Sequence, residues 1–383
     1  MIVVAGHICL DVTPRLTSAA ALTPGALVEA GPVAFSAGGA VANVGLALAR
    51  LGFGATLLGL AGDDQFGAIL QGELDGSAVG SYLSVELSVT TAESTSYSIV
   101  IDQPGRDRSF LHHSGCNDAF EPKHLQTERW LQAELLHFGY PPLMQGLYRD
   151  GGVGLAAEFA RLRSEGVVVS LDMAKPDPLG ESGKVDWRAF LRTVLPHVDL
   201  FLPSWEEVWY MCYPHEALAG PTLERLARVA TDLLGLGPAV VGLKLGERGL
   251  YLRSAGSERV ARAGRRGLPA GWADRELISP NMSVNAKGTT GAGDATIAGL
   301  LAAITDKVPL NTAATLSSAV GACSVEGLGS VAGIVTWEQI AELVGAGWAR
   351  TEQWRSEELE ERGWHRDADT GVLFGPADGG GTK

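Results

Sequence analysis

Residues Gly288–Asp294 (GTTGAGD) combine glycines with an acidic side chain directly before an apolar stretch, Ala295–Ile304. The apolar stretch predicts a helix, so the glycines would lie at its N-terminus, where backbone N–H groups lack partners and the helix dipole adds positive charge. Glycines let a phosphate approach that backbone closely. Asp294, in the first turn, can accept a proton from a hydroxyl directed at the phosphate. The segment therefore indicates phosphoryl transfer, and an ordinary Gly-rich turn capped by Asp is the alternative interpretation.

Composition limits the classes of partner. The chain has 383 residues, and 46% of them are hydrophobic, which is ordinary for a soluble globular enzyme. Its net charge of −14 argues against nucleic acid or an anionic membrane as the main partner, so local features must hold any anionic substrate. The cysteines form no CxxC pair, and we expect reduced thiols. No apolar run reaches the ~18–20 residues that span a bilayer, and the N-terminus does not resemble a signal peptide, so we predict a cytoplasmic protein.

Short aliphatic runs alternate with helical patterns, which is typical of a parallel sheet covered by helices. The predicted strands are Ile2–Ala5, Thr56–Leu60, Leu135–Phe138, Val167–Leu171, Leu200–Leu202 and Val240–Leu243. The predicted helices include Ala40–Leu51, Leu155–Glu165 and Leu223–Leu234. The strand patterns are continuously apolar, as expected for strands that are covered on both faces.

Other stretches break this alternation. Thr13–Phe35 and Thr95–His112 each predict an antiparallel ribbon. Arg253–Arg275 holds six arginines, which could gather phosphates or form a solvated loop. After about Gly345 the chain turns polar and acidic, and we expect disorder at its last residues, 379–383. The aromatic residues of this C-terminal tail indicate that its middle packs on the rest of the protein: Trp348, Trp354, Trp364 and Phe374.

Four segments occur in one order: Ala5–Asp11, Ser36–Asn43, Gly62–Gly67 and Thr289–Asp294. In residues and order they resemble the ribokinase (PfkB) family of carbohydrate and nucleoside kinases, over about residues 1–344. The resemblance implies a three-layer α/β/α sandwich with a mainly parallel central sheet and a small β-sheet lid. The core would be residues 1–10, 36–94 and 113–345, and the lid 11–35 and 95–112. The resemblance also implies a homodimer through the lid, and it does not extend to the tail, 346–383.

The resemblance assigns the catalytic and sugar-binding residues. Asp294 would be the catalytic base, and Gly291, Ala292 and Gly293 would form the anion cradle. The implied substrate-binding residues are Asp11, Gly38, Gly39, Asn43, Asp63 and Asn117. His112 and His113 are adjacent, so on a strand they would point to opposite faces and only one could contact a substrate.

On the nucleotide side, the resemblance implies ATP and Mg²⁺ as cofactors. Lys244, Gly246, Gly249 and Thr290 would bind the nucleotide, and Glu207 would be tied to magnesium. Two positions depart from the family pattern. Ser204 stands where the family usually has Asn, which alters the magnesium–water network. Gly288 stands where many members have an Asp beside a monovalent cation, so we do not expect potassium activation.

These observations predict an ATP-dependent kinase that phosphorylates a primary hydroxyl of a small sugar. A nucleoside kinase of the same family is the first alternative, and a non-catalytic sugar- or nucleotide-binding regulatory protein is the second. A phosphorylated acceptor would need basic residues in the pocket, and Arg106 or Arg108 could supply them.

Overall fold

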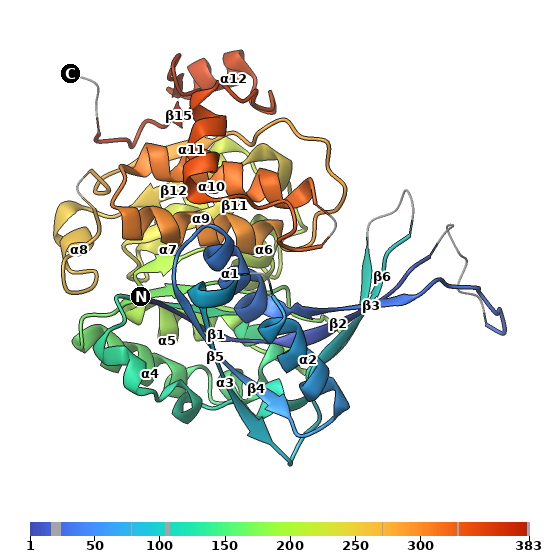
Figure 1. Ribbon diagram of the computed structural model, residues 1–383. Helices are drawn as coiled ribbons and strands as arrows, with labels where there is room; N and C mark the ends of the chain where they lie inside the picture. The colour runs from blue at the N-terminus through green and yellow to red at the C-terminus, as the bar shows by residue number, and fades with distance from the viewer. Residues whose placement is uncertain (17–23, 78, 104–107, 270, 328, 381–383) are drawn as a thin grey trace.

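The computed structural model describes residues 1–16, 24–77, 79–103, 108–269, 271–327 and 329–380. In this part of the chain eleven strands form one sheet (Figure 1). In spatial order they are β14 (His365–Arg366), β15 (Leu373–Phe374), β13 (Glu276–Ser279), β12 (Leu250–Ser254), β11 (Val240–Lys244), β10 (Leu200–Phe201), β9 (Val168–Leu171), β8 (Leu135–Gly139), β1 (Ile2–Gly6), β4 (Ala55–Gly62) and β5 (Leu83–Thr90). Pairing is parallel from β5 to β11 and antiparallel from β11 to β14.

Helices cover both faces of the sheet. One apolar cluster contains residues of α1 (Gly39–Arg50), α9 (Ala292–Asp306), α10 (Leu310–Val325) and α11 (Trp337–Gly345). The other contains residues of α4 (Val153–Ser164), α5 (Trp187–Val194), α6 (Trp205–Cys212) and α7 (Leu223–Leu234). The remaining helices are α2 (Gln65–Asp75), α3 (Gln145–Tyr148), α8 (Ser257–Ala261) and α12 (Ser356–Glu361). In β1, Ile2 and Val4 pack in the first cluster and Val3 in the second, as alternation along a strand requires. The predicted α/β sandwich is confirmed.

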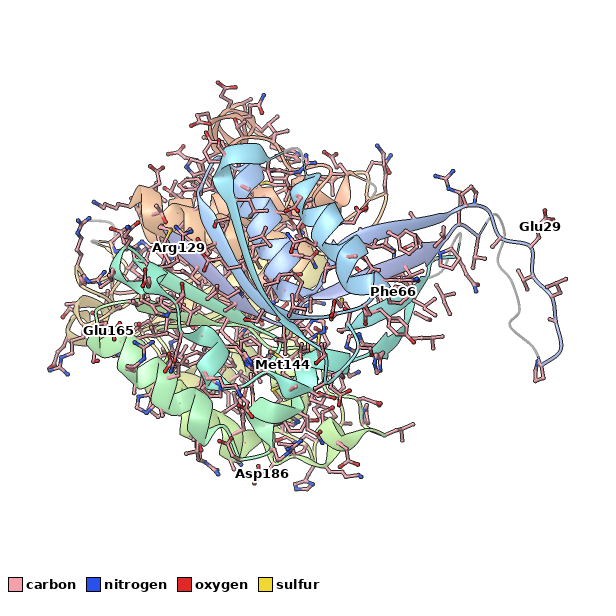
Figure 2. All side chains as sticks on the ribbon, turned by 60° about the horizontal axis from the view of Figure 1, so that its bottom comes forward. Glu29, Phe66, Arg129, Met144, Glu165 and Asp186 are labelled. Atoms are coloured by element: carbon pink, nitrogen blue, oxygen red, sulfur yellow. The ribbon has the colours of Figure 1, made fainter. Side chains whose placement is uncertain are left out.

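A second, small sheet projects from the body of the molecule (Figure 1). Its strands are β3 (Val33–Gly38), β2 (Cys9–Pro14), β6 (Tyr97–Ile101) and β7 (Ser109–His113). Each predicted ribbon contains an antiparallel pair, and parallel pairing of β2 with β6 joins the two pairs. Figure 2 shows Glu29 at the far end of the projection and Phe66 at its base, where the Phe66 ring packs edge-on against Tyr97 at 5.3 Å.

The C-terminal tail is part of the main sheet. β15 pairs with β13, and Trp364 and Leu373 are buried in the cluster beneath α7. Arg275 forms an ion pair of 2.6 Å with Asp378. The expected packing of the tail is thus present. Of the residues expected to be disordered, 381–383 lie outside the described residues.

The arginine-rich segment, Arg253–Arg275, contacts residues at the amino-terminal ends of the parallel strands, opposite their carboxyl ends. Arg259 pairs at 2.9 Å with the buried Asp199, which directly precedes β10, and Arg265 donates to the Ala133 carbonyl. Arg262 and Arg266 are exposed. The segment is therefore partly structural rather than a solvated loop throughout. None of the helices in the described ranges has the length and apolar character needed to cross a membrane.

We expect Leu373→Ala to destabilise the protein by about 2–5 kcal/mol, because it removes a fully buried side chain that joins the tail to the core. Urea unfolding measures this change. The control Leu218→Ala removes a leucine that is 61% exposed, and should stay within about 0.5 kcal/mol of wild type. A Leu373→Ala variant as stable as this control would show that the tail adds no stability.

Candidate active site

Two cavities meet at the carboxyl ends of the parallel strands, where α/β sheets bind ligands. The first, about 900 Å³, lies against the small sheet and includes Asp11 and Asn43 in its wall. The second, about 580 Å³, includes Lys244 and Asn281. Both are lined by Tyr140, Glu207, Thr289, Gly291 and Asp294. The first turn of α9 therefore stands at the junction of two separate binding spaces.

Asp294 is held in place at this junction by two distant segments. Asn43 Nδ2, from α1, donates to Asp294 Oδ2 at 2.9 Å. The hydroxyl of Tyr140, which follows β8, donates to Oδ1 at 2.8 Å and to Oδ2 at 2.9 Å. Burial raises the pKa of Asp294, and Lys244, Tyr140 and Asn43 oppose that rise. The result is an oriented carboxylate whose pKa is higher than usual, which suits a base.

The α9 N-terminus has the geometry of an anion cradle. Gly291 is its N-cap with φ of 78°, and a Cβ there would lie 2.5 Å from Ser330 Cβ, so only glycine fits. Ala292 and Gly293 begin the helix; the Ala292 N–H donates to the Thr289 carbonyl at 3.3 Å, and the Gly293 N–H has no carbonyl four residues earlier within the helix. The side chain of Lys244 lies 3.4 Å from where a Gly293 Cβ would be. Backbone donors and an ammonium thus face one space.

Lys244 is itself the centre of a buried cluster of charges. It ends β11, and its Nζ donates to both oxygens of Asp172 at 2.7 Å. Burial alone would lower the pKa of Lys244, but Asp172, Glu207 and Asp294 together raise it. Burial raises the pKa of Glu207, although Lys244 and the Ser204 N–H, which donates to Glu207 Oε2 at 2.6 Å, oppose this. The ammonium therefore stays charged among three carboxylates.

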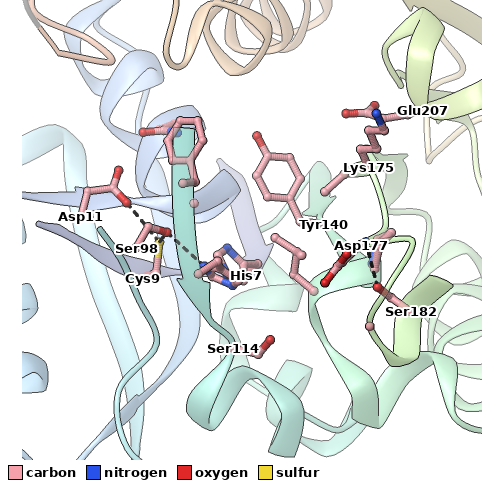
Figure 3. A pocket seen from close by; sticks show the side chains of 18 of the residues that line it. His7, Cys9, Asp11, Ser98, Ser114, Tyr140, Lys175, Asp177, Ser182 and Glu207 are labelled. Carbon is pink, nitrogen blue, oxygen red and sulfur yellow. Dashed lines mark hydrogen bonds between the residues drawn. The ribbon is translucent and has the colours of Figure 1, made fainter. Parts of the chain in front are cut away.

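The first cavity has a polar wall that runs from Asp11 to His7 (Figure 3). Cys9 Sγ donates to Asp11 Oδ1 at 3.5 Å, Ser98 Oγ and His112 Nδ1 share a hydrogen bond of 3.0 Å, and the Nε2 atoms of His112 and His7 lie 3.3 Å apart. Burial raises the pKa of Asp11 to about 6. Burial also lowers the pKa of His7, and lowers that of His112 to about 4, so both rings are neutral at neutral pH.

Two buried atoms on this wall have no hydrogen-bond partner within the described part of the protein: Asn43 Oδ1 and His7 Nδ1. Buried polar atoms are normally paired, because an unpaired one costs about 1–3 kcal/mol. Gly38 leaves room for the Asp11 carboxylate in this wall, since a Cβ at position 38 would lie 2.3 Å from that carboxylate. Gly39 lines the cavity directly.

The structure brings most of the predicted site residues to the two cavities. Those that line them are Asp11, Gly39, Asn43, Glu207, Lys244, Gly246, Gly249, Thr290, Gly291, Ala292, Gly293 and Asp294. Thr290, expected on the nucleotide side, lines the first cavity and accepts a hydrogen bond from Arg108. His112 lines the first cavity, whereas His113 hydrogen-bonds Ser94, as opposite faces require. Arg106 lies outside the described residues.

The predicted substrate residues Asp63 and Asn117 line neither cavity. Asp63 is exposed and lines neither cavity, because it follows β4 near the sheet edge, where its N–H pairs with Thr90 of β5. Asn117 is fully buried behind the first cavity, and its Nδ2 donates to the Ile8 carbonyl at 2.8 Å. It holds the backbone between β1 and β2.

Sequence reasoning missed Tyr140, Asp172 and His7. Tyr140 directly follows β8, Asp172 directly follows β9 and His7 directly follows β1. The signal in the sequence was the place of each residue directly after a parallel strand, because polar side chains there face the edge of the sheet where ligands bind.

A magnesium ion fits this donor set only together with a ligand. No group of three or more His, Cys, Asp or Glu side chains is arranged to hold a metal in the described ranges. Mg²⁺ in phosphate sites commonly uses one or two carboxylates with phosphates and waters. The Glu207 carboxylate, in the wall shared by both cavities, can play that part.

Comparison with known proteins agrees with this geometry. The pfkB family carbohydrate kinase profile matches residues 1–337. A probable chloroplastic fructokinase-6 of Arabidopsis thaliana is 23% identical over 347 residues, which cover 88% of this chain and 81% of that protein. A putative ribokinase II from E. coli in complex with ATP and Mg²⁺ has a TM-score of 0.67 at 20% identity, covering 90% and 99% of the two chains. Arabidopsis thaliana ribokinase complexed with ribose and ATP has 0.66 at 18%, covering 89% and 97%. The chain belongs to the pfkB family of carbohydrate kinases.

We expect Lys244→Met to destabilise the protein by about 3–5 kcal/mol, because Asp172 is left buried without its cation. The unpaired carboxyl then has a folded pKa well above its unfolded value. The folded state can take up a proton at low pH but not at high pH, so the loss should be smaller at pH 5 than at pH 8.

Urea unfolding at both pH values measures this difference. The double variant Lys244→Met, Asp172→Asn should recover stability at pH 8, since no buried charge is left at that pair. If Lys244→Met lowered the free energy of unfolding equally at pH 5 and pH 8, this would contradict the ion pair between Lys244 and Asp172.

Proposed function

We propose that the protein transfers the γ-phosphate of ATP to a primary hydroxyl of a small sugar. The observation that carries this proposal is the meeting of two cavities at Asp294 and the N-terminus of α9. Phosphoryl transfer needs a donor space, an acceptor space and a base between them. Membership of a carbohydrate kinase family supports the same reaction class.

The second cavity suits the donor. Lys244 and the N–H groups of Ala292 and Gly293 provide positive charge and donors for phosphate oxygens. Gly246 and Gly249 line the same space, where their backbone is accessible. Magnesium bound with the nucleotide would neutralise phosphate charge, with Glu207 as the carboxylate nearest that role. The complex of a related kinase with ATP and Mg²⁺ supports this choice of donor.

The first cavity suits a polyhydroxyl acceptor. Asp11 can accept from two vicinal hydroxyls, and the side chains of Asn43 and His7 line the same cavity. An exocyclic hydroxymethyl group projects from a sugar ring, so it can enter the junction beside Asp294. There Asp294 takes the hydroxyl proton as the oxygen–phosphorus bond forms and the bond from the γ-phosphorus to the ADP oxygen breaks, while Tyr140 and Asn43 hold the carboxylate in position.

Arg108, which directly precedes β7, adds a second cation beside the anion cradle at the α9 N-terminus. It donates to Thr290 and pairs with Asp102 at 3.3 Å. Its guanidinium also occupies the space beside Gly288, where a Cβ would lie 2.3 Å from Arg108 Nη2. A carboxylate at position 288 would contact this guanidinium and not a monovalent cation. This supports the prediction that the protein does not require potassium.

Release of ADP across a panel of sugars, sugar phosphates and nucleosides tests the proposal. We expect turnover with a free sugar and ATP. Turnover with nucleosides alone would favour the nucleoside kinase, and binding by calorimetry without any ADP release would favour the regulatory protein.

We expect Asp294→Asn to lower kcat by about 10²–10⁴-fold, because the amide cannot take the hydroxyl proton. The side chain keeps its size, so sugar and ATP affinities measured by calorimetry should change little. Retention of more than about a tenth of wild-type kcat would contradict the assignment of Asp294 as the base.

Acceptor binding should weaken as the pH falls through 6, because Asp11 has a pKa of about 6 and only its ionised form accepts two hydroxyls. At pH 5 about a tenth of this carboxyl is ionised, so we expect affinity about tenfold lower than at pH 7. Calorimetry without nucleotide measures it. His112, with a pKa of about 4, stays neutral in this window. Asp11→Asn should bind weakly with a flat profile, and a profile as steep as wild type would remove Asp11 from the site.

A further inference from the structure

Residues 348–354 of the C-terminal tail, beyond the part that the family profile covers, bring Thr351 to the wall of the second cavity. Their backbone pairs with the loop that follows β13. The Ser283 N–H donates to the Ala349 carbonyl at 2.8 Å, and the Thr351 N–H donates to the Asn281 carbonyl at 2.8 Å. Thr351 itself lines the cavity, together with Asn281 and Ser283. The tail thus contributes directly to this binding space.

Side chains of the same segment hold a second loop of this cavity, Gly246–Arg248. Thr351 Oγ1 donates to the Glu247 carbonyl at 3.1 Å, and Trp354 Nε1 donates to the Arg248 carbonyl at 3.1 Å. The Arg248 guanidinium also lies 5.5 Å from the centre of the Trp354 ring. Segment 348–354 therefore fixes both loops with respect to each other.

The segment is anchored on both sides. Before it, α11 packs in the core through Trp337 and Ile340. After it, Trp364 and Leu373 are buried, and β15 pairs with β13. A wall held in this way loses little freedom when a ligand binds, which favours affinity.

We propose that residues 348–354 form part of the nucleotide site and set its affinity for the adenosine end of ATP. This rests on the proposed function, which puts the phosphates at the α9 N-terminus. Since Lys244 and Gly293 occupy the phosphate end, the rest of the nucleotide extends along the same cavity toward Asn281 and Thr351. The tail is then a specificity element that this chain adds to the family fold.

Two variants each delete one donor: Thr351→Val, which keeps the side-chain volume, and Trp354→Phe, which also makes a buried ring smaller. We expect the Kd of a non-hydrolysable ATP analogue with Mg²⁺, measured by calorimetry, to rise about threefold to tenfold in each. Acceptor KM and kcat at saturating ATP should stay within twofold, since neither residue lines the first cavity. Thr351→Ser should restore wild-type affinity. A purely stabilising role would lower the urea midpoint without moving this Kd.

Thr370→Val is the matched control, because this tail threonine donates to Asp367 and lies outside the second cavity. Its nucleotide Kd should equal that of wild type. Unchanged Kd values in both Thr351→Val and Trp354→Phe, or an equal rise in Thr370→Val, would overturn this proposal alone. Absence of nucleotide binding by the wild-type protein would overturn it together with the proposed function.

Discussion

The site depends on one buried cation, the Lys244 ammonium, among the carboxylates of Asp172, Glu207 and Asp294. Each comes from a different element, and only the parallel sheet brings β9, β11, α6 and α9 to one edge. The cluster has three carboxyl groups to one ammonium, burial raises the pKa of all three carboxyls, and the chain has a net charge of −14. A phosphate entering this space therefore needs additional cations and backbone donors, which explains why the α9 N-terminus and Arg108 stand beside it.

In the proposed reaction, Asn43 would link acceptor binding to the orientation of the base. Its amide nitrogen holds Asp294, and its side chain also lines the first cavity. A substrate in contact with this side chain would therefore touch the group that orients the base. Tyr140 keeps the carboxylate in place from the other side. On the proposed function, one side chain in α1 would thus both meet the substrate and position the base.

The sequence predicted six of the seven parallel strands of the main sheet in the described residues, together with the α9 N-terminus, since continuous apolar runs and the Gly-rich segment are local signals. It missed β5, in which apolar and polar residues alternate. It did not predict β12 and β13, which follow β11 as antiparallel strands outside the regular alternation of strand and long helix, or β15, which has two residues and pairs with residues about a hundred positions earlier. Tyr140, Asp172 and His7 were missed, since single residues after strands carry no local pattern. Asp63 lies away from both cavities, because a strand end locates the ligand edge of a sheet but not the distance from its centre.

The C-terminal tail also covers an edge of the main sheet. Without it, β13 would be an open edge, with unpaired N–H and C=O groups that could pair with another chain. β15 covers that edge at Leu277 and Ile278, and β14 ends the sheet with a strand of two residues. The chain that reaches β15 must first pass the loop after β13, where Thr351 bonds Asn281. Covering the edge and shaping the second cavity are therefore consequences of one path of the backbone.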